Sequence, residues 1–555
     1  MAPRPRPQPL PFSSFGWSFA GALLIALSLP PVGAFPLAWV ALVPLIARWS
    51  VRRPTLDYGR ELYALLLTTS CCAGFWLLFN PDPGTAALGG LSLFLVPVPL
   101  TLAFLGAGLV RERAGLYAGL GALALNVLAA EFLTLAANVS VPWMLLGHTQ
   151  VEAVEFIQMA DVGGVLLLSL WVLLLNGVVF LALPRAARAP GGRAPGGRGA
   201  GGREAASRYG ERGASIALFT ALLALPVAYG SVRTAQADVP AGYTRVGIVQ
   251  PGIGPVEWDE QGAATKVDYL AGLSDDLLER WRPSAADAAA PPSRARAAGE
   301  LGLIIWPQSS LPYMGTDRGE RQLYERLERW CAQRDVALLA GATTGPDGVD
   351  RQRGRPDAGD LANSAVLIRP GKPVRRYDQM RRIPLADARA AAGSDRVLLT
   401  AGGTDIATTV GFESLFGDHV RRFTRQGAGL IVVLSRNDLW GRSAGLYQHL
   451  QFTRLRAIES RRAVVLSTVS GVSAMILPGG GIEQIAGWMD QDVTGIDVPT
   501  FRGETFYVRH GDWVGRWALA LALALNLGVV AASVFLPEAL PARSAPARRA
   551  VGFRG

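Results

Sequence analysis

Long apolar runs constrain this chain more than any other feature. They dominate residues 15–232 and return once near the C-terminus. A helix needs about 20 apolar residues to cross a bilayer, and several of these runs reach that length. Eight runs can be distinguished: 15–30, 34–49, 61–79, 86–110, 114–137, 164–183, 214–232 and 514–536. The first two are short, so they can be tilted, interfacial or merged, and we predict about eight transmembrane segments in all.

The arginines predict the orientation of these segments. Basic residues precede the first run and follow the second, fourth, sixth and last runs, whereas the alternate loops 80–85 and 138–163 contain no Lys or Arg. Because basic loops stay in the cytoplasm, both termini are expected there. No small-residue cleavage site follows the first run, so we expect it to be retained. The polar block between the seventh and eighth runs then lies outside, in the periplasm of a bacterium with two membranes.

The charge and cysteine content narrow the range of partners. The formal net charge of +10 comes almost wholly from Arg, and the only lysines are Lys266 and Lys372. Because the arginines cluster beside apolar runs, they favour a role in membrane topology over nucleic-acid binding. The three cysteines have neither the number nor the spacing of a disulfide framework or a metal site. We therefore expect the lipid bilayer as a partner, and neither nucleic acid, nor metal, nor cofactor.

Composition divides the chain into three parts. Residues 1–237 form the predicted membrane bundle, 238–512 the outer domain, and 513–555 a last transmembrane helix with a cytoplasmic tail. Within the bundle, the Gly/Arg-rich segment 184–213 is expected to be a cytoplasmic loop. Its low-complexity stretch 187–207 favours a flexible loop over a contact with anionic lipid or RNA. Residues 283–299 are expected to be a disordered insertion in the outer domain.

The outer block alternates strand-like and helical stretches. Short β-type runs are TRVGIVQ, LGLIIWP, ALLAGATT, NSAVLIRP, GLIVVLS and AVVLSTVSG. Helical periodicity is found at 263–281, 319–335 and 444–461. Such alternation is typical of a layered α/β domain. The predicted fold class is therefore an α-helical membrane bundle that carries an α/β domain.

Several longer motifs, taken in order, resemble one known family. The membrane half contains LPPVGAFPLAWVALVP, VPWMLLGHTQ and IQMADVGGVLLLSLWVLLLN. The outer half contains VGIVQPGIGPVEWDEQ, IIWPQSSLP, LLAGATTG, NSAVLIRPGKPVRRYDQ, NDLWGRSAGLYQHLQFTRLRAIESRRAVV and TFYVRHGDW. From about residue 19 to 536, this pattern is similar to that of the apolipoprotein N-acyltransferases.

The resemblance implies an αββα, nitrilase-like carbon–nitrogen hydrolase domain seated on a membrane bundle in the bacterial inner membrane. It also implies transfer of an acyl chain from a phospholipid to the N-terminal amine of a diacylglyceryl-cysteine on a lipoprotein. In that ping-pong reaction a Cys thiolate carries the acyl group, a Glu is the general base, and a Lys stabilises the oxyanion.

The three positions that correspond to this triad carry other residues here. Gln308 stands at the Glu position, Gln379 at the Lys position and Gly411 at the Cys position. Covalent acyl transfer needs a nucleophile that is also a leaving group, a base, and a donor to the oxyanion. An amide has no useful basicity, and glycine has no side chain. We therefore expect no intact catalytic triad.

Other positions match the family and have two interpretations. They can form a retained pocket for an acyl chain or lipoprotein, or they can form a hydrogen-bonded core that needs no ligand. The residues concerned are Trp306, Tyr377, Asp387, Glu413, Asn437, Asp438 and Trp440.

Substitute nucleophiles have little support in the sequence. Ser309, Ser310 and Ser414 lie near the replaced positions, but no His or Lys base is evident beside them. Cys331 lies in a helical stretch and is interpreted as a buried structural thiol, and Cys71 and Cys72 as packing residues in a span. His449 and His510 are expected to be structural.

Acidic residues of the membrane half divide into two groups. Glu131 lies inside an apolar run, where carboxylates are costly and often functional, so it is a candidate for a polar contact or a headgroup role. Glu152, Glu155 and Asp161 fall near an outer loop and are expected to be solvated.

Three functional hypotheses follow. The first is an inactive family member, a pseudoenzyme, that binds lipid or lipoprotein or regulates a partner such as a triad-intact paralogue. The second is an active acyltransferase that uses substitute residues. The third is a scaffold for envelope assembly that uses only the bundle.

Overall fold

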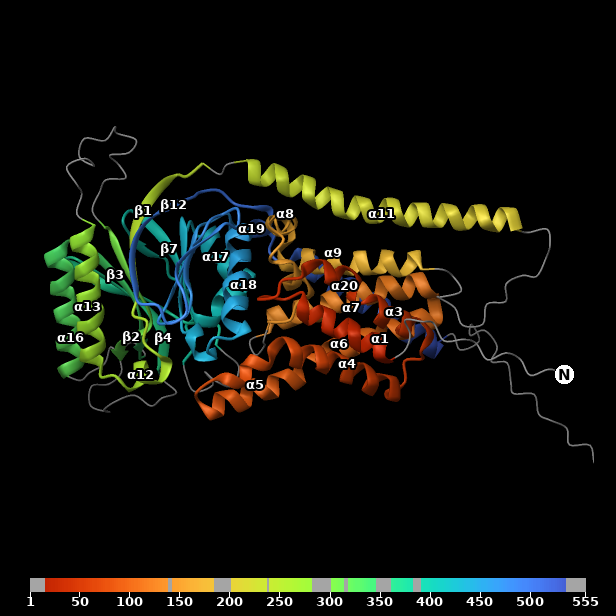
Figure 1. The fold of residues 1–555 in the computed structure, drawn as a ribbon, viewed down its shortest axis with the longest axis horizontal. Helices are drawn as coiled ribbons and strands as arrows, with labels where there is room; N and C mark the ends of the chain where they lie inside the picture. The colour runs from red at the N-terminus through yellow and green to blue at the C-terminus, as the bar shows by residue number, and fades with distance from the viewer. Residues whose placement is uncertain are drawn as a thin grey trace, which may run out of the picture.

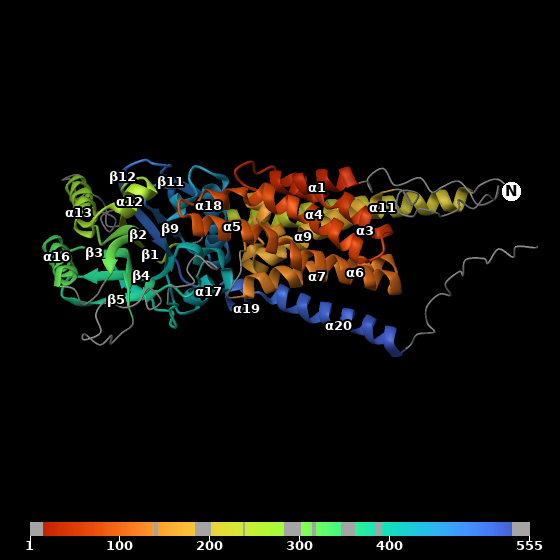
Figure 2. The same ribbon diagram turned by 90° about the horizontal axis from the view of Figure 1, so that it is seen from below.

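The structure is a computed structural model that describes residues 15–137, 142–183, 201–236, 239–281, 301–313, 318–345, 361–382 and 391–535. Figures 1 and 2 show an elongated molecule with a helical bundle at one end and an α/β domain at the other. Asp387 and the segment 283–299 fall outside the described residues, as does most of the Gly/Arg-rich stretch.

The bundle is built from the apolar runs. Its helices are α1 (Phe15–Leu27), α2 (Ala38–Ala41), α3 (Val43–Val51), α4 (Leu56–Gly74), α5 (Pro83–Leu95), α6 (Pro97–Ala114), α7 (Leu116–Ala136), α8 (Val154–Ile157), α9 (Ala160–Ala182), α11 (Gly201–Ala235) and α20 (Trp513–Phe535). Within the described residues, six helical stretches are long and apolar enough to cross a membrane, and the first two runs form shorter helices. The chain is therefore a multi-pass membrane protein.

Part of the segment 184–213, which we expected to be a cytoplasmic loop, is helical. Helix α11 begins at Gly201 and continues without a break into the seventh apolar run. Adding a residue to an existing helix costs much less than starting one, and the Arg-, Glu- and Ala-containing stretch before the run favours helix. The helix therefore extends well beyond its apolar part.

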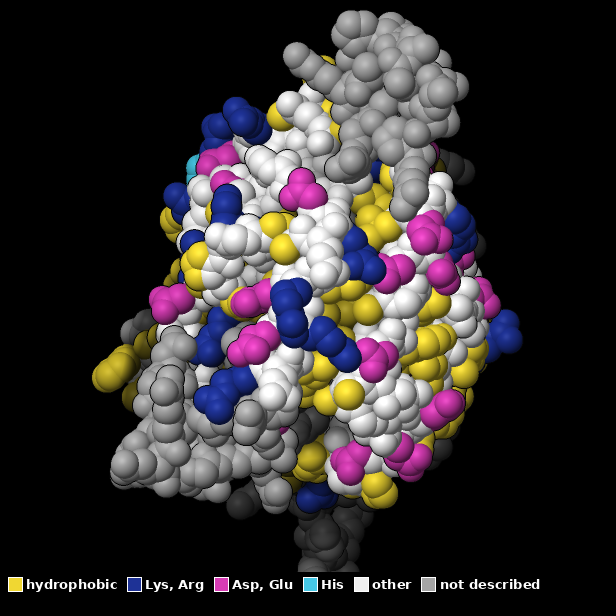
Figure 3. Space-filling model, turned by 90° about the vertical axis from the view of Figure 1, so that its left-hand side faces the viewer, with side chains coloured by type: hydrophobic (Ala, Val, Ile, Leu, Met, Phe, Trp, Pro, Cys, Tyr) yellow, Lys and Arg dark blue, Asp and Glu magenta, His cyan; other side chains and the backbone are white. Residues whose placement is uncertain are grey.

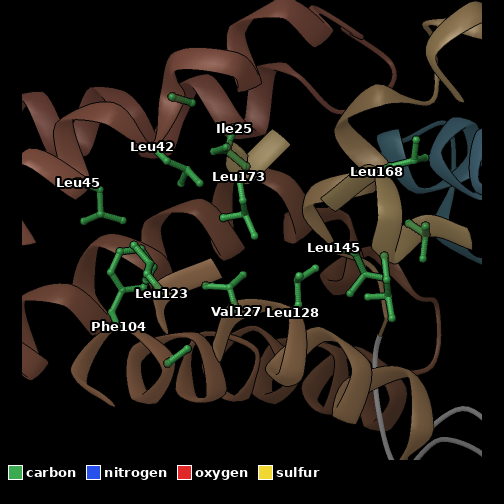
Figure 4. Packing of buried hydrophobic residues seen from close by; sticks show 14 of the residues in the cluster. Ile25, Leu42, Leu45, Phe104, Leu123, Val127, Leu128, Leu145, Leu168 and Leu173 are labelled. Carbon is green, nitrogen blue, oxygen red and sulfur yellow. The ribbon is translucent and has the colours of Figure 1, made fainter. Parts of the chain in front are cut away.

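The bundle core is a continuous apolar cluster. Figure 4 shows Ile25, Leu42, Phe104, Val127 and Leu173 converging from α1, the α2–α3 segment, α6, α7 and α9. Helix α20 returns from the far end of the chain and packs against α7, as Figure 2 shows. The same cluster includes residues of helix α18 in the α/β domain, so the two parts of the molecule share one core.

The α/β domain contains two six-stranded mixed sheets. One has the order β12-β1-β2-β3-β4-β5 and the other β11-β10-β9-β8-β7-β6. The strands are β1 (Gly242–Gln250), β2 (Leu303–Tyr313), β3 (Ala337–Thr344), β4 (Ala362–Arg369), β5 (Lys372–Asp378), β6 (Leu399–Ala401), β7 (Thr404–Val410), β8 (Leu430–Ser435), β9 (Val464–Thr468), β10 (Ser473–Ile476), β11 (Ile482–Ala486) and β12 (Asp492–Thr500). The sheets pack face to face through an apolar core.

Helices cover both outer faces of this sandwich. Helices α13 (Ala263–Arg280) and α16 (Arg318–Arg334) pack on the first sheet, and α17 (Gly417–Arg425) and α18 (Ala444–Ser460) lie on the second, between it and the bundle (Figure 1). Smaller helices are α12 (Pro255–Glu260) and α19 (Phe506–His510). The predicted αββα domain, with all six predicted strands and three predicted helices, is confirmed.

The outer face of the domain has the character of a solvated surface. Figure 3 views this face and shows Lys and Arg side chains interspersed with Asp and Glu over α13 and α16. Mixed charges of this kind are typical of a surface that faces water. The opposite face of the sandwich packs on the bundle.

A buried aromatic cluster joins the two parts. Trp76 and Trp143 of the bundle lie 4.8 Å apart between ring centroids, and both approach Trp440 of the α/β domain. The Gln448 side-chain oxygen on α18 accepts hydrogen bonds from the indole nitrogens of Trp76 (3.1 Å) and Trp143 (2.6 Å). Buried polar groups that are satisfied in this way fix the orientation of the domain on the bundle.

Candidate functional site

A cavity of about 710 Å³ lies between the bundle and the α/β domain. Helices α5, α6 and α7 form its membrane side. From the α/β domain come Gln308, Ser309, Gln379, Gly411, Ser435 and Arg436. Gln308, Gln379 and Gly411, which the resemblance matches to the triad positions, therefore all line one cavity.

The strand order explains this convergence. Strands β7 and β8 are parallel, so their carboxyl ends meet at one edge, where Gly411 follows β7 and Ser435 ends β8. Gln379 directly follows β5, and Gln308 lies within β2 of the facing sheet. Ligand sites in α/β folds commonly form at the carboxyl ends of parallel strands.

Gly411 has a backbone conformation that favours glycine. Its φ is +56°, and it begins the turn η5 (Gly411–Leu415). A Cβ atom at this position would lie 3.1 Å from the Gln308 side-chain oxygen. A larger side chain at 411 therefore requires both a left-handed backbone and a small shift of Gln308.

The Gln379 amide is fully used by its surroundings. Its oxygen accepts from Asn363 Nδ2 at 3.0 Å, and its nitrogen donates to the carbonyl oxygens of Arg381 (3.0 Å) and Val410 (3.4 Å). The side chain is 2 % exposed. Gln379 thus links the loop after β5 to the end of β7 without carrying a charge.

Glu413 organises the same region from behind the cavity. Its carboxylate accepts hydrogen bonds from the Tyr377 hydroxyl and from the backbone nitrogens of Met380, Arg381 and Val410, all within 2.9 Å. Burial raises the pKa of Glu413 to about 7, although these donors favour the ionised form. Glu413 does not line the cavity; it holds together the two loops that do.

Most of the other family-matching residues lie outside the cavity wall. Trp306 is buried in the core under α13, where its indole donates to the Ser274 hydroxyl. Asn437 and Asp438 are fully buried in the turn η6 (Asn437–Trp440), which also contains Trp440. Trp440 does line the cavity. The described part of this set thus contributes one wall residue and several supporting ones.

Arg436 is the one basic side chain among the described residues of the cavity wall. Its guanidinium donates to Asp259 at 2.7 Å and to Asp438 at 3.1 Å. These two carboxylates raise the pKa of Arg436 above its usual value despite burial, so the group stays charged. Arg436 is already paired and was not identified from the sequence.

The structure corrects the prediction that Ser414 has no histidine nearby. Its hydroxyl lies 3.0 Å from His449 Nε2, a contact between residues 35 positions apart. Both side chains are fully buried, neither lines the cavity, and burial lowers the pKa of His449 to about 4. The pair lies in the packing between η5 and α18, where a substrate cannot reach the hydroxyl.

Two further expectations have different outcomes. Cys331 is fully buried in α16, and burial raises the pKa of its thiol to about 12, which confirms a structural thiol.

The prediction that Asp161 is solvated is wrong. Its carboxylate is 3 % exposed and accepts from Tyr229 Oη, Arg233 Nε and Arg461 Nη2 at 2.6–2.9 Å. These partners come from distant parts of the chain, so no local pattern reveals them.

The remaining candidates are placed as follows. Glu152 is partly exposed and Glu155 is exposed. His510 is exposed and stacks on Phe506. Glu131 is 4 % exposed in α7 and lines the cavity. Among the described residues, no group of three His, Cys, Asp or Glu side chains has the arrangement of a metal site.

Comparisons with known proteins match two family models to different parts of this chain. The apolipoprotein N-acyltransferase N-terminal domain matches residues 21–178, and the carbon–nitrogen hydrolase domain matches residues 245–500. An apolipoprotein N-acyltransferase of Geobacter metallireducens is 27% identical, over 96% of this chain and 97% of its own. One from Chlorobaculum tepidum is 26% identical, over 91% and 94%.

Among solved structures, Nit3 of Saccharomyces cerevisiae, a member of the nitrilase superfamily, covers 47% of this chain and 91% of its own. It is 12% identical, with a TM-score of 0.35. The nitrilase-like fold of the α/β domain is supported by its two six-stranded sheets and by the carbon–nitrogen hydrolase match.

Proposed function

We propose that this chain is a member of the apolipoprotein N-acyltransferase family that binds phospholipid or lipoprotein at the cavity without transferring an acyl chain. On this proposal it is a pseudoenzyme of the lipoprotein maturation pathway, acting by binding or by regulating a partner such as a triad-intact paralogue. The inner membrane holds residues 1–237 and 513–555, with the termini in the cytoplasm and residues 238–512 in the periplasm.

One observation carries the proposal. Gln308, Gln379 and Gly411, which the resemblance matches to the triad, lie together on the cavity wall as two amides and a glycine. An amide cannot take the proton that general-base catalysis requires, a function that contributes about 10²–10⁴ in rate. Without a side chain at residue 411, no thioester can form there.

The neutral pair Gln308 and Gln379 also fits a site that is stable without a buried ion pair. Loss of only one charged member of a buried pair leaves the other uncompensated, at a cost of about 3–5 kcal/mol. Here both positions are amides, and Gln379 has replaced the ionic role with three hydrogen bonds. The cavity itself remains open, with about 710 Å³ for a ligand.

The substitute-residue hypothesis has less support. Ser309 and Ser435 line the cavity, but among the described residues neither hydroxyl contacts a histidine or a carboxylate. Ser414 has the histidine but does not line the cavity. The scaffold hypothesis leaves the cavity without a role.

Complementation tests the proposal. The chain is expressed in a bacterium whose own apolipoprotein N-acyltransferase is under conditional control, and survival is scored after depletion. We expect no rescue by the wild-type chain. Rescue at normal protein levels would contradict an inactive site.

A restored site provides the matched control. The triple variant Gln308→Glu, Gln379→Lys, Gly411→Cys is compared with the same triple carrying Gly411→Ala, which has the Cβ but no thiol. Acyl-thioester formation only in the Cys-containing variant indicates that the cavity still binds a phospholipid. Failure of both variants, with both folded, points to loss of lipid binding as well as of the triad.

A further inference from the structure

Glu131 is the buried carboxylate of the cavity wall that lacks an ionic partner. Its Oε1 accepts a hydrogen bond from the Leu146 backbone nitrogen at 2.7 Å, and the Ser169 hydroxyl lies close by. Its Oε2 has no hydrogen-bond partner among the described residues, although the side chain is only 4 % exposed. The neighbouring donors are neutral, so they stabilise the carboxylate without cancelling its charge.

An unpaired carboxylate in a membrane bundle is costly and marks a functional position. Among the described residues, none forms an ion pair with Glu131. A cationic group of a bound ligand would supply the missing partner. Because no described basic residue pairs with Glu131, the cavity is suited to a ligand that carries a positive charge.

The charges around the cavity favour the same ligand chemistry. The ionisable side chains of its described wall are Asp82, Glu131, Asp259 and Arg436. Arg436 is occupied by Asp259 and Asp438, and the family's lysine position is Gln379. The wall therefore attracts a cation and offers no free cation to a phosphate or carboxylate.

An apolar slot lies beside this carboxylate. The slot has a volume of about 70 Å³ inside the bundle and shares Val96, Leu100, Met144 and Leu145 with the cavity wall. Leu146, whose nitrogen binds Glu131, also lines it. Figure 4 shows Ile25, Phe104 and Leu145 around this part of the bundle. A ligand with an ammonium group at Glu131 can therefore place an apolar chain end next to it.

We propose that Glu131 binds the primary ammonium group of a lipid ligand and so determines which lipids the cavity accepts. The inference rests on the proposed function in taking the cavity as a lipid site. Two sources share this chemistry: an ethanolamine phospholipid headgroup and the free N-terminal amine of a diacylglyceryl-cysteine peptide. Either one carries both the ammonium and the apolar chains.

Binding to the full-length purified protein in detergent tests the proposal with four probes. They are phosphatidylethanolamine, its N-acetylated form, a diacylglyceryl-cysteinyl peptide with a free N-terminus, and the same peptide N-acetylated. Dissociation constants are measured by native mass spectrometry. We expect the free amine of at least one pair to bind about tenfold more tightly than its acetylated form, because acetylation removes the charge.

Variants assign that preference to one residue. Glu131→Gln keeps the shape, and it is expected to weaken binding of the free amine about tenfold and to abolish the preference. Glu155→Gln makes the same change at an exposed residue outside the cavity wall and should leave the preference intact. The pair that responds identifies the source of the ammonium group.

The outcomes separate the inference from the proposed function. Equal binding of free and acetylated forms by the wild-type protein would overturn the role of Glu131 while leaving lipid binding in place. A preference that persists in Glu131→Gln would overturn it as well. No binding of any probe would contradict both. If Glu131→Gln does not fold, equal binding of the free and acetylated probes by the wild-type protein would still overturn the role of Glu131.

Discussion

At the residue scale, neutral hydrogen bonds hold together the part of the cavity wall around Gln379. The Gln379 amide satisfies three polar neighbours, which belong to strand β4, to the loop after β5 and to the end of β7. A lysine here would lose the acceptor that Asn363 uses, and it would place an ammonium in the cavity wall that includes Gln308, whose neutral amide cannot balance the charge. The two positions are therefore coupled, and their substitutions should not be additive.

Gln379→Lys alone is expected to destabilise the protein by about 3 kcal/mol, because it buries an unpaired charge. The double variant Gln308→Glu, Gln379→Lys should recover part of that loss. Thermal unfolding midpoints in detergent for the wild type, both single variants and the double variant complete the cycle. Additive losses would show that the two side chains do not interact across the cavity.

Glu413 makes stability depend on pH. Burial raises the pKa of Glu413 to about 7 from an ordinary value of 4.5. Between pH 4.5 and 7, Glu413 is therefore protonated in the folded protein and ionised in the unfolded chain. Stability should therefore fall as the pH rises from 4.5 to 7 and then level off. Between these two pH values, each pH unit should lower the free energy of unfolding by about 1.4 kcal/mol.

The measurement compares unfolding midpoints from pH 4.5 to 8 for the wild type, Glu413→Gln and the control Glu483→Gln. Glu413→Gln is less stable throughout, because it loses an acceptor for backbone nitrogens, but its pH dependence should be flatter. Glu483 is exposed, so its variant should follow the wild type. Identical slopes in all three proteins would rule out Glu413 as the titrating group.

At the element scale, helix α9 has a kink where the α/β domain packs against it. Helix α9 contains Gly164 with φ +64° and ψ −166°, a region open almost only to glycine. A Cβ there would lie 2.5 Å from the Tyr507 ring of α19. The kink thus lets the α/β domain approach the start of a transmembrane helix.

Gly164→Ala is expected to cost about 1–3 kcal/mol, from backbone strain and the contact with Tyr507. Gly177→Ala in the same helix has nothing within 4 Å of the added Cβ, so it should be neutral or stabilising by up to about 1 kcal/mol. Unfolding midpoints of the two variants provide the comparison. A loss in Gly177→Ala as large as that in Gly164→Ala would contradict the role of the kink.

The same scale shows what the sequence could predict. Apolar strands such as β3 and β8 were predictable because they are buried on both faces and read as continuous apolar runs. Strands β5 (KPVRRYD) and β12 (DVTGIDVPT) have no such run and form because neighbouring strands pair with them. The N-terminal part of α11 was missed because its polar residues resemble a loop.

The candidate site was predictable only in part. The resemblance located Gln308, Gln379 and Gly411, and strand order explains why they meet. Contacts such as Ser414 with His449, or Asp161 with Arg461, join residues far apart in sequence and leave no local pattern. Arg436 was missed because its partner Asp259 is 177 positions away, although its second partner, Asp438, is only two residues further along the chain.

At the scale of the whole molecule, one buried carboxylate connects bundle and domain. Asp161 at the start of α9 accepts from Arg233 of α11 and from Arg461, which ends α18. The Asp161 and Arg461 side chains are 4% and 7% exposed. This ion cluster therefore lies inside the junction, next to the packing of α18 on α9.

Asp161→Asn is expected to destabilise the junction by about 3–5 kcal/mol, because it removes the carboxylate that pairs with the buried guanidinium group of Arg461 and the partly buried one of Arg233. Faster hydrogen exchange in α18 and a lower unfolding midpoint would report this. Asp57→Asn is the control, since its pair with Arg60 is exposed and contributes about 0–1 kcal/mol. If hydrogen exchange in α18 is unchanged in Asp161→Asn, the ion cluster does not stabilise the junction between the bundle and the α/β domain.

The central claim concerns chemistry at residue 411, and intact-protein mass spectrometry tests it most directly. The wild-type chain and the triple variant Gln308→Glu, Gln379→Lys, Gly411→Cys are purified from the same membranes and incubated with phospholipid under identical conditions. The account predicts that a mass increase of one fatty acyl group, released by hydroxylamine, is found on the variant and never on the wild type. An acyl adduct on the wild-type chain would contradict it.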